Sequence, residues 1–305
     1  MKVMKTTKEW FIEAPWGKIA LISWGNPGGD PVLLVHGRQD SAATFIPLLN
    51  NLPETYSYVG VDLPGHGKSD PFPIGVMLTR FHFLAAVEYA VKHLKWDRFV
   101  YVAHSMGCEQ GLFFNVIHPG KIAKFIFLDP LPSFQRLQIH DFKEYYGTFY
   151  HEYYSNFKKY NTNDRVYSKR NALESVMRAR GLNEEQAEIV LSRNLQSVGE
   201  DTYKLSWDKR LRLPAAQNYP PDYYYGLFSK NLPPTLIISA SNSLDPRNKK
   251  RNDIAIELVS QLQKSTDHFY VETVTGGHDV HLTDPELVAK CILGFLNRSM
   301  GRAKL

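Results

Sequence analysis

The chain has 305 residues and a formal net charge of +5, and hydrophobic residues make up 43% of it. This length suits one large α/β domain with an insertion, or two small domains, and the composition is typical of a globular protein. No apolar run approaches the roughly 18–20 residues of a membrane-spanning helix, and no apolar signal-peptide core follows the N-terminus. Basic residues are spread along the chain without a dense tract, which argues against nucleic-acid binding.

Eight segments have the composition of β-strands. In chain order they are 8–14, 18–24, 31–35, 57–61, 98–102, 122–128, 234–240 and 268–274. Most are short apolar runs, as expected for strands that are buried on both faces of a sheet. Between them, apolar residues recur at helical spacing in 83–94 and 287–296. This alternation predicts an α/β fold with a mostly parallel eight-stranded sheet and helices on both faces.

The middle of the chain breaks the alternation. Residues 131–230 contain no convincing strand and are rich in tyrosine, phenylalanine and charged side chains. We therefore expect residues 1–130 and 231–305 to form the core, and residues 131–230 to form an inserted helical lid. The two cysteines, Cys108 and Cys291, are too few for a disulfide scaffold, which favours a reducing compartment.

A candidate nucleophile stands at the end of the fifth predicted strand. There the sequence runs Val102-Ala-His-Ser-Met-Gly107 and continues into an apolar helical segment. A small residue two positions before and after a serine, between a strand and a helix, is typical of a nucleophile elbow. Such a turn lifts Ser105 above the sheet, and here the earlier small residue is alanine instead of the usual glycine.

Two backbone N–H groups are candidates for stabilising an oxyanion. Met106 follows Ser105 at the N-terminus of the expected helix, where the helix dipole also favours negative charge. Arg38 follows His36-Gly37 at the end of an earlier buried strand, and its N–H could be the second donor. His36 itself is expected to be structural.

A serine nucleophile needs a general base, because its hydroxyl is hardly ionised at neutral pH. Histidine has a suitable pKa. The predicted base is His278, which directly follows Gly276-Gly277 after the last strand. His281 is the competing candidate, although it is better explained as an ordinary loop histidine whose hydrogen bonds are satisfied.

The base in turn needs a carboxylate that orients it. Asp245 lies in the loop after the strand at 234–240 and preserves the chain order Ser, Asp, His. Asp129 is the alternative acid, because it ends the preceding strand in the sequence Phe-Leu-Asp-Pro. A third reading of Asp129 is a cap on the first lid helix.

These motifs resemble those of the α/β-hydrolase superfamily over the whole chain apart from the expected lid. Segments 14–20, 35–42, 94–99 and 277–282 are similar to the serine hydrolase-like (kraken-type) family. The resemblance implies a triad of Ser105, Asp245 and His278 and a lid between the sixth and seventh strands. Arg38 departs from the large aromatic residue expected at its position and places a charge near the pocket mouth.

The predicted function is therefore that of a serine hydrolase. It would cleave an ester, thioester or lactone of a small, apolar substrate through an acyl-enzyme on Ser105. One alternative is a small-ligand receptor of the same fold with slow or single turnover. Another is C–C hydrolase or haloperoxidase-like chemistry with the same triad. Haloalkane dehalogenases and epoxide hydrolases share this fold but need a carboxylate at the position of Ser105, so the sequence argues against both.

No metal or nucleotide cofactor is expected, since the histidines are dispersed and no glycine-rich phosphate loop follows a strand. The last three residues, Ala303, Lys304 and Leu305, match the small-basic-leucine pattern that the peroxisomal import receptor reads. The sequence thus predicts a peroxisomal location, or otherwise a cytoplasmic one, with the import receptor as partner.

Overall fold

The structure, a computed structural model, describes residues 4–298 apart from 163–164, 214 and 216. Ala303, Lys304 and Leu305, in which the import signal was predicted, lie outside the described residues. Among the helices of the described part, none is long and apolar enough to cross a membrane.

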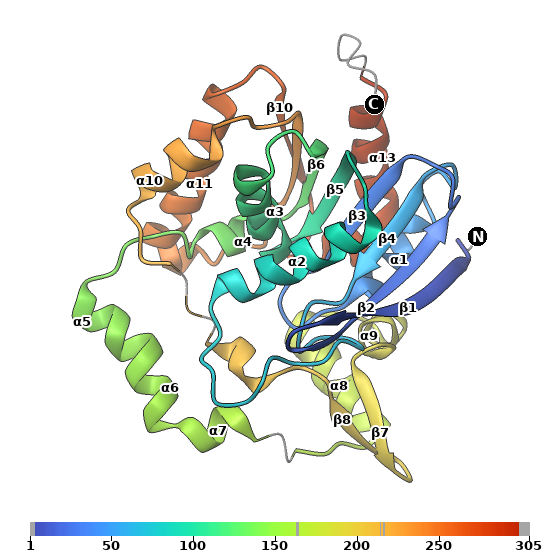
Figure 1. Ribbon diagram of the computed structural model, residues 1–305, viewed down its shortest axis with the longest axis vertical. Coiled ribbons are helices and arrows are strands. Elements are labelled where there is room, and N and C mark those ends of the chain that lie inside the picture. The colour runs from blue at the N-terminus through green and yellow to red at the C-terminus, as the bar shows by residue number, and fades with distance from the viewer. Residues whose placement is uncertain (1–3, 163–164, 214, 216, 299–305) are drawn as a thin grey trace.

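One eight-stranded sheet runs through the molecule (Figure 1). In spatial order its strands are β1 (Thr6–Ala14), β2 (Gly17–Gly25), β4 (Ser57–Val61), β3 (Pro31–Val35), β5 (Phe99–His104), β6 (Ile122–Leu128), β9 (Thr235–Ala240) and β10 (Phe269–Val274). β1 and β2 form an antiparallel hairpin, and the six strands from β4 to β10 are parallel. The predicted mostly parallel eight-stranded sheet is thus confirmed, with strand ends within a few residues of those expected.

Helices cover both faces of this sheet. The first face is covered by α2 (Arg80–Leu94), α3 (Met106–Ile117), α4 (Leu131–Phe134), α10 (Pro221–Phe228) and α11 (Lys249–Lys264). The second face is covered by α1 (Ile46–Leu49), α12 (Val280–Thr283) and α13 (Pro285–Leu296). Each face has its own apolar core, and a fully buried side chain such as Phe125 contributes roughly 1.5–3 kcal/mol.

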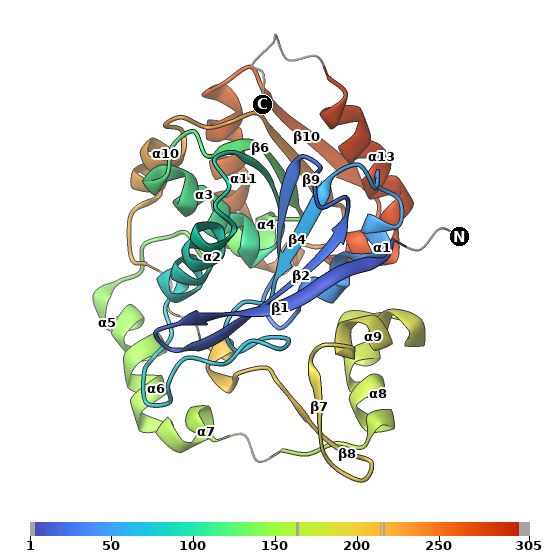
Figure 2. The same cartoon turned by 45° about the vertical axis from the view of Figure 1, so that its right-hand side comes forward.

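Within the segment between β6 and β9, residues 129–234, α4 and α10 pack on the first face, and the other elements lie at one end of the sheet. Its outlying elements are α5 (Phe142–Tyr145), a π-helical turn (Tyr146–His151), α6 (Glu152–Ser155), α7 (Phe157–Asn161), α8 (Lys169–Arg180), α9 (Glu184–Leu191), β7 (Leu195–Gly199), β8 (Thr202–Leu205) and a 3-10 turn (Lys209–Arg212). In both views α5 to α7 lie on one side and α8, α9, β7 and β8 on the other (Figures 1 and 2). We call residues 129–234 the inserted segment.

The inserted segment differs from the sequence-based expectation in one element. β7 and β8 pair as an antiparallel hairpin, so the prediction that residues 131–230 contain no strand is wrong. The hairpin is short, and no residue of β7 is buried. Strands of this kind lack the long apolar run that reveals a strand in a sequence.

Candidate active site

Ser105 stands in a sharp turn between β5 and α3, as predicted. Its φ of +51° lies in the left-handed region, which a residue other than glycine adopts at a cost. Gly107 makes the turn possible, because a Cβ there would lie 2.3 Å from the carbonyl oxygen of Val35. Ser105 is nearly buried, at 8% exposure, and caps the N-terminus of α3.

His278 contacts this serine. The chain turns after β10, and the Nε2 atom of His278 lies 2.9 Å from the Oγ atom of Ser105. The backbone of His278 is held as well, since its carbonyl oxygen accepts a hydrogen bond of 2.9 Å from Nε2 of His104. Hydrogen-bond contact of the two predicted residues is what nucleophile activation requires.

Asp129 orients the other side of the His278 ring. One carboxylate oxygen of Asp129 lies 2.6 Å from Nδ1 of His278. The other accepts hydrogen bonds from the N–H of Ala240 at 2.9 Å and from the hydroxyl of Ser243 at 3.0 Å. Because Asp129 is fully buried and both of its oxygens are bound, its orientation is fixed.

Asp245 does not reach His278. Its carboxylate forms hydrogen bonds with Arg247, both to the backbone N–H and to the guanidinium, and these bonds lower the pKa of Asp245. It caps a 3-10 turn, Pro246–Asn248, that leads into α11. The prediction that Asp245 orients the base is therefore wrong, and the alternative, Asp129, holds this position. The loop after β9 instead directs the hydroxyl of Ser243 to Asp129.

The two expected oxyanion donors lie beside the nucleophile. Met106 is the first residue of α3 and directly follows Ser105. The backbone before Arg38 passes close to Ser105, since a Cβ on Gly37 would lie 3.0 Å from the Cβ of Ser105. Within the described part of the chain, the N–H groups of Arg38 and Met106 have no hydrogen-bond partner.

The arrangement can be compared with known proteins. A family model described as "alpha/beta hydrolase fold" matches residues 30–285, which is most of the chain. This chain belongs to the α/β-hydrolase family. The predicted fold class is thereby confirmed.

Individual relatives agree with this assignment. The α/β hydrolase described here is 29% identical to "Serine hydrolase-like protein 2" of Homo sapiens over 294 residues, covering 93% of this chain and 92% of that protein. The predicted similarity to serine hydrolase-like proteins is thus confirmed. Among solved structures, a hypothetical protein of Pseudomonas aeruginosa superimposes with a TM-score of 0.80 at 24% identity, covering 96% and 100% of the two chains. A thioesterase domain from the curacin biosynthetic pathway gives 0.73 at 21% identity, covering 95% and 99%.

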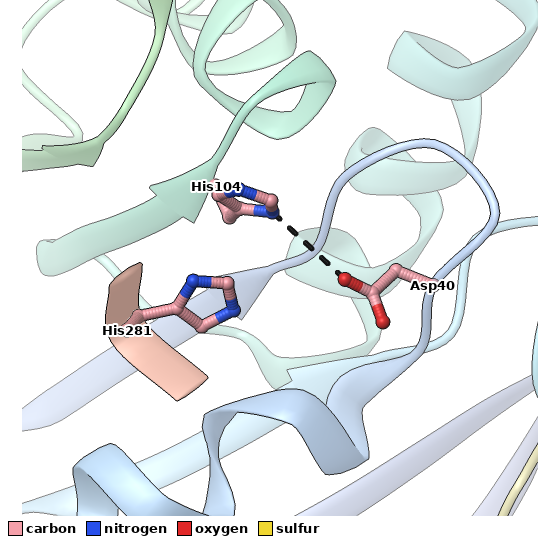
Figure 3. Close-up of side chains that lie close together, drawn as sticks. All are labelled: Asp40, His104 and His281. Carbon is pink, nitrogen blue, oxygen red and sulfur yellow. Dashed lines mark ion pairs between the residues drawn. The ribbon is translucent and has the colours of Figure 1, made fainter. Parts of the chain in front are cut away.

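A buried polar cluster in this hydrolase packs against His278 through His104, whose ring centroid lies 4.5 Å from that of His278. Figure 3 shows that Asp40, His104 and His281 point toward one another from three separate elements. The three residues are at most 2% exposed, and Nδ1 of His104 lies 3.9 Å from Asp40. His281 does not contact Ser105, and neither of its ring nitrogens has a partner among the described residues. It is therefore a core residue of α12, not a satisfied loop histidine.

The surroundings of this cluster favour the neutral form of both histidines. Burial lowers the pKa of His104 well below its ordinary value and lowers the pKa of His281 to about 3. Asp40, His104 and His281 offer three metal-ligand atoms within 4.8 Å of one another. A guanidinium group of Arg180 already lies 3.3 Å from Asp40, so a cation is in place without a metal. Among the described residues no fourth protein ligand joins this group, as a structural zinc site would require.

Arg180 ties the inserted segment to the core. It ends α8 and forms hydrogen bonds with Asp40 and with Asp279, the residue next to His278; its Nε lies 2.9 Å from Asp279. Burial opposes the charge of Arg180, but the two carboxylates raise its pKa above the ordinary value. Sequence reasoning missed this contact of Arg180 with the two aspartates, which we call the Arg180 clamp. Its only local sign was an aspartate beside the predicted base.

A hollow of about 520 Å³ opens beside His278, between the core and the inserted segment. Its wall is part apolar and part cationic, and includes Arg38, Tyr167, Val176, Trp207 and Arg212. A second hollow of similar volume lies between the C-terminal halves of α2 and α3, and none of its lining residues belongs to the Ser105 site. The hollow at His278 is therefore the candidate substrate pocket.

Proposed function

We propose that this α/β hydrolase cleaves an ester-type bond through an acyl-enzyme on Ser105. The proposal rests on one observation, the continuous hydrogen-bonded chain from Ser105 through His278 to Asp129. Carboxylic esters, thioesters and lactones all have the electrophilic carbonyl that such a nucleophile attacks. The structural likeness to a thioesterase domain is compatible with this class of substrate.

The first step would be attack of the Ser105 Oγ atom on the substrate carbonyl carbon. His278 removes the Ser105 proton through Nε2 and becomes an imidazolium ion. Asp129 accepts the Nδ1–H hydrogen bond, keeps the ring in the required tautomer and stabilises the positive charge. The N–H groups of Arg38 and Met106 would stabilise the oxyanion.

The second half of the reaction repeats these roles with water. The protonated His278 gives its proton to the leaving group, and the acyl group stays on Ser105. Water then gives a proton to His278 and attacks the acyl carbon. The bond between this carbon and Ser105 Oγ breaks, His278 returns the proton to Oγ, and the acid is released. Ser105 is only 8% exposed, and we expect the attacking water to enter through the hollow beside His278.

The inserted segment is proposed to act as a lid over this pocket. α8, β8 and the turn at Lys209–Arg212 supply part of the pocket wall, and the core supplies the reacting groups. A lid that excludes water strengthens the electrostatic interactions inside a site.

The test is a burst experiment with p-nitrophenyl acetate and p-nitrophenyl octanoate on the wild-type protein and on Ser105→Ala. We expect one equivalent of p-nitrophenol per chain in the burst, then steady turnover, with both lost in the variant. A burst without turnover would favour the alternative of a small-ligand receptor. Hydrolysis by Ser105→Ala at the wild-type rate would rule out Ser105 as the nucleophile.

We also propose that Ala303, Lys304 and Leu305 direct the chain to the peroxisome. A small, basic and leucine tripeptide at a free carboxyl end has the chemistry that the import receptor reads. A fluorescent protein fused to the N-terminus should give peroxisomal puncta, and deletion of Leu305 should make the signal diffuse. Diffuse signal from the intact fusion would contradict the proposal.

A further inference from the structure

Two hollows of the hydrolase meet at Arg212. The hollow beside His278 has a volume of about 520 Å³, and a smaller one of about 130 Å³ is lined by Arg136, Phe149 and Arg251. Arg212 lines both, so the smaller hollow adjoins the candidate substrate pocket at this side chain. A substrate whose carbonyl reacts at Ser105 could therefore extend toward Arg136.

Four arginines line the two hollows without a paired carboxylate. Arg38, Arg136, Arg212 and Arg251 have no ion pair within the described part of the chain. This contrasts with Arg80, whose guanidinium is paired with the buried Glu109 at 2.7 Å. The hollows therefore contain an excess of positive charge that the described residues do not neutralise.

The two carboxylates that line the hollows form no ion pair with these arginines. Asp279 in the larger hollow is bound by Arg180. Glu144 in the smaller hollow lies 3.5 Å from His140. Neither is available to the four unpaired arginines at ion-pair distance.

All four arginines expose surface to solvent, although Arg38 and Arg136 are also partly desolvated and lie near other cations. Burial, followed by the charges of Arg80 and Arg38, lowers the pKa of Arg136 to about 10. Burial and the charge of Arg80 also lower the pKa of Arg38. Arginine stays charged at neutral pH, so an anion bound beside Arg136 would reduce the repulsion from its neighbouring cations.

The larger hollow also has an apolar wall, formed by Tyr167, Val176, Leu205 and Trp207. Arg38 supports the turn that carries Arg212, since its Nη1 donates a hydrogen bond of 3.3 Å to the carbonyl of Leu211. The larger hollow thus combines an apolar wall with the guanidinium groups of Arg38 and Arg212, and the smaller hollow adds those of Arg136 and Arg251.

We infer that the substrate is an ester-type compound whose apolar chain ends in an anionic group, a carboxylate or a phosphate, bound by Arg136, Arg212 and Arg251. Guanidinium groups bind both anions with two parallel hydrogen bonds, which a neutral chain end cannot offer. This inference rests on the proposed ester hydrolysis at Ser105, and it replaces the expectation of a wholly apolar substrate.

The first measurement compares mono-p-nitrophenyl esters of glutaric, adipic and suberic acid with p-nitrophenyl butanoate, hexanoate and octanoate. We expect at least one of the anionic esters to have a kcat/KM about tenfold or more above that of its neutral counterpart. Because exposed charges are screened by salt, the preference should shrink as ionic strength rises. Equal kcat/KM values across all pairs would overturn the inference.

Variants identify the residues responsible. Arg136→Gln and Arg251→Gln should each lower the ratio of anionic to neutral kcat/KM by about tenfold. The matched control is Arg98→Gln, which removes the same charge from an exposed site just before β5, at the opposite end of that strand from Ser105. It should leave both values unchanged. A ratio that stays the same in both hollow variants would contradict the assignment.

Binding separates this inference from the proposed function. In Ser105→Ala, calorimetry should detect binding of adipate or butyl phosphate, and the additional change Arg136→Gln should weaken it. The stronger of the two ligands identifies the anion as a carboxylate or a phosphate. If neutral esters turn over through Ser105 but neither anion binds, only the anion site is refuted. If anions bind but no ester turns over, only the hydrolytic proposal is refuted.

Discussion

At the scale of single residues, the orientation of Asp129 determines which ring nitrogen of His278 carries the proton. One oxygen of Asp129 is occupied by two donors, the N–H of Ala240 and the hydroxyl of Ser243. In Asp129→Asn the amide oxygen should remain with these donors, so its NH₂ group would face His278. That group would force the proton onto Nε2, and we expect kcat to fall on the order of 10⁴-fold with p-nitrophenyl esters.

The matched control is Asp245→Asn. Asp245 is bound to Arg247 at the surface, so this variant should keep kcat within about twofold of the wild type. The two variants remove the same charge from two aspartates that follow neighbouring strands. A larger loss in Asp245→Asn than in Asp129→Asn would restore Asp245 as the orienting acid.

At the scale of elements, the strand–turn–helix unit at Ser105 depends on a close backbone approach. In Gly107→Ala the new methyl group would lie 2.3 Å from the carbonyl oxygen of Val35, so β3 and α3 would have to separate. We expect the free energy of unfolding to fall by about 1–3 kcal/mol and esterase activity to be lost. Thermal unfolding followed by circular dichroism measures the first effect.

Gly294 in α13 provides the comparison, because a Cβ there meets no atom within 4 Å. Gly294→Ala should raise the free energy of unfolding by about 0.5–1 kcal/mol, since alanine is the better helix former. If both variants changed stability in the same direction, the close approach at Gly107 would not be the cause.

The attachment of the inserted segment depends on a second local feature, the end of α8. Arg180→Met keeps much of the side-chain length but leaves Asp40 and Asp279, both buried, without their cation. We expect a loss of about 3–5 kcal/mol in the free energy of unfolding, because unpaired buried charges are costly. Thermal unfolding checks the stability, and kcat/KM reports whether the pocket wall is displaced.

Arg178→Gln is the control on the same helix, because Arg178 is exposed and two residues away. It should leave the unfolding midpoint unchanged. Adding Asp40→Asn and Asp279→Asn to Arg180→Met should restore part of the stability, since no buried charge would then lack a partner. No recovery would indicate that Arg180 acts through packing alone.

At the scale of the whole molecule, buried histidines make the fold sensitive to acid. Burial lowers the pKa values of His36, His66, His104 and His281, the last to about 3. Below about pH 6.5 the unfolded chain binds protons that the folded chain does not. The contribution of these histidines to the free energy of unfolding is therefore fully present above this pH. It decreases as pH falls, by up to about 1.4 kcal/mol per pH unit for each such histidine.

Unfolding midpoints measured between pH 8 and pH 5 should show this decline. His281→Gln should flatten it, because one buried titrating group is removed. His268→Gln should not, since His268 is exposed. An identical pH slope in the wild type and in His281→Gln would show that His281 does not contribute to acid sensitivity.

Local patterns were sufficient to predict several features of this protein. The strands, the turn at Ser105 and the histidine after the last strand each arise from a few consecutive residues. Small residues that flank a serine between a strand and a helix, or an apolar run bounded by turns, indicate the same local structure in any fold. The similarity to serine hydrolase-like proteins followed from such segments.

Tertiary structure alone decided the rest. Asp129 and Asp245 follow β6 and β9, the next two strands on one side of the strand that carries the nucleophile, and only the three-dimensional path of their loops determines which carboxylate reaches His278. The Arg180 clamp, the Asp40–His104–His281 cluster and the unpaired arginines join residues that are far apart in the chain. Their positions depend on how the inserted segment packs on the sheet, and no local pattern contains that information because the contacts form only when distant elements meet.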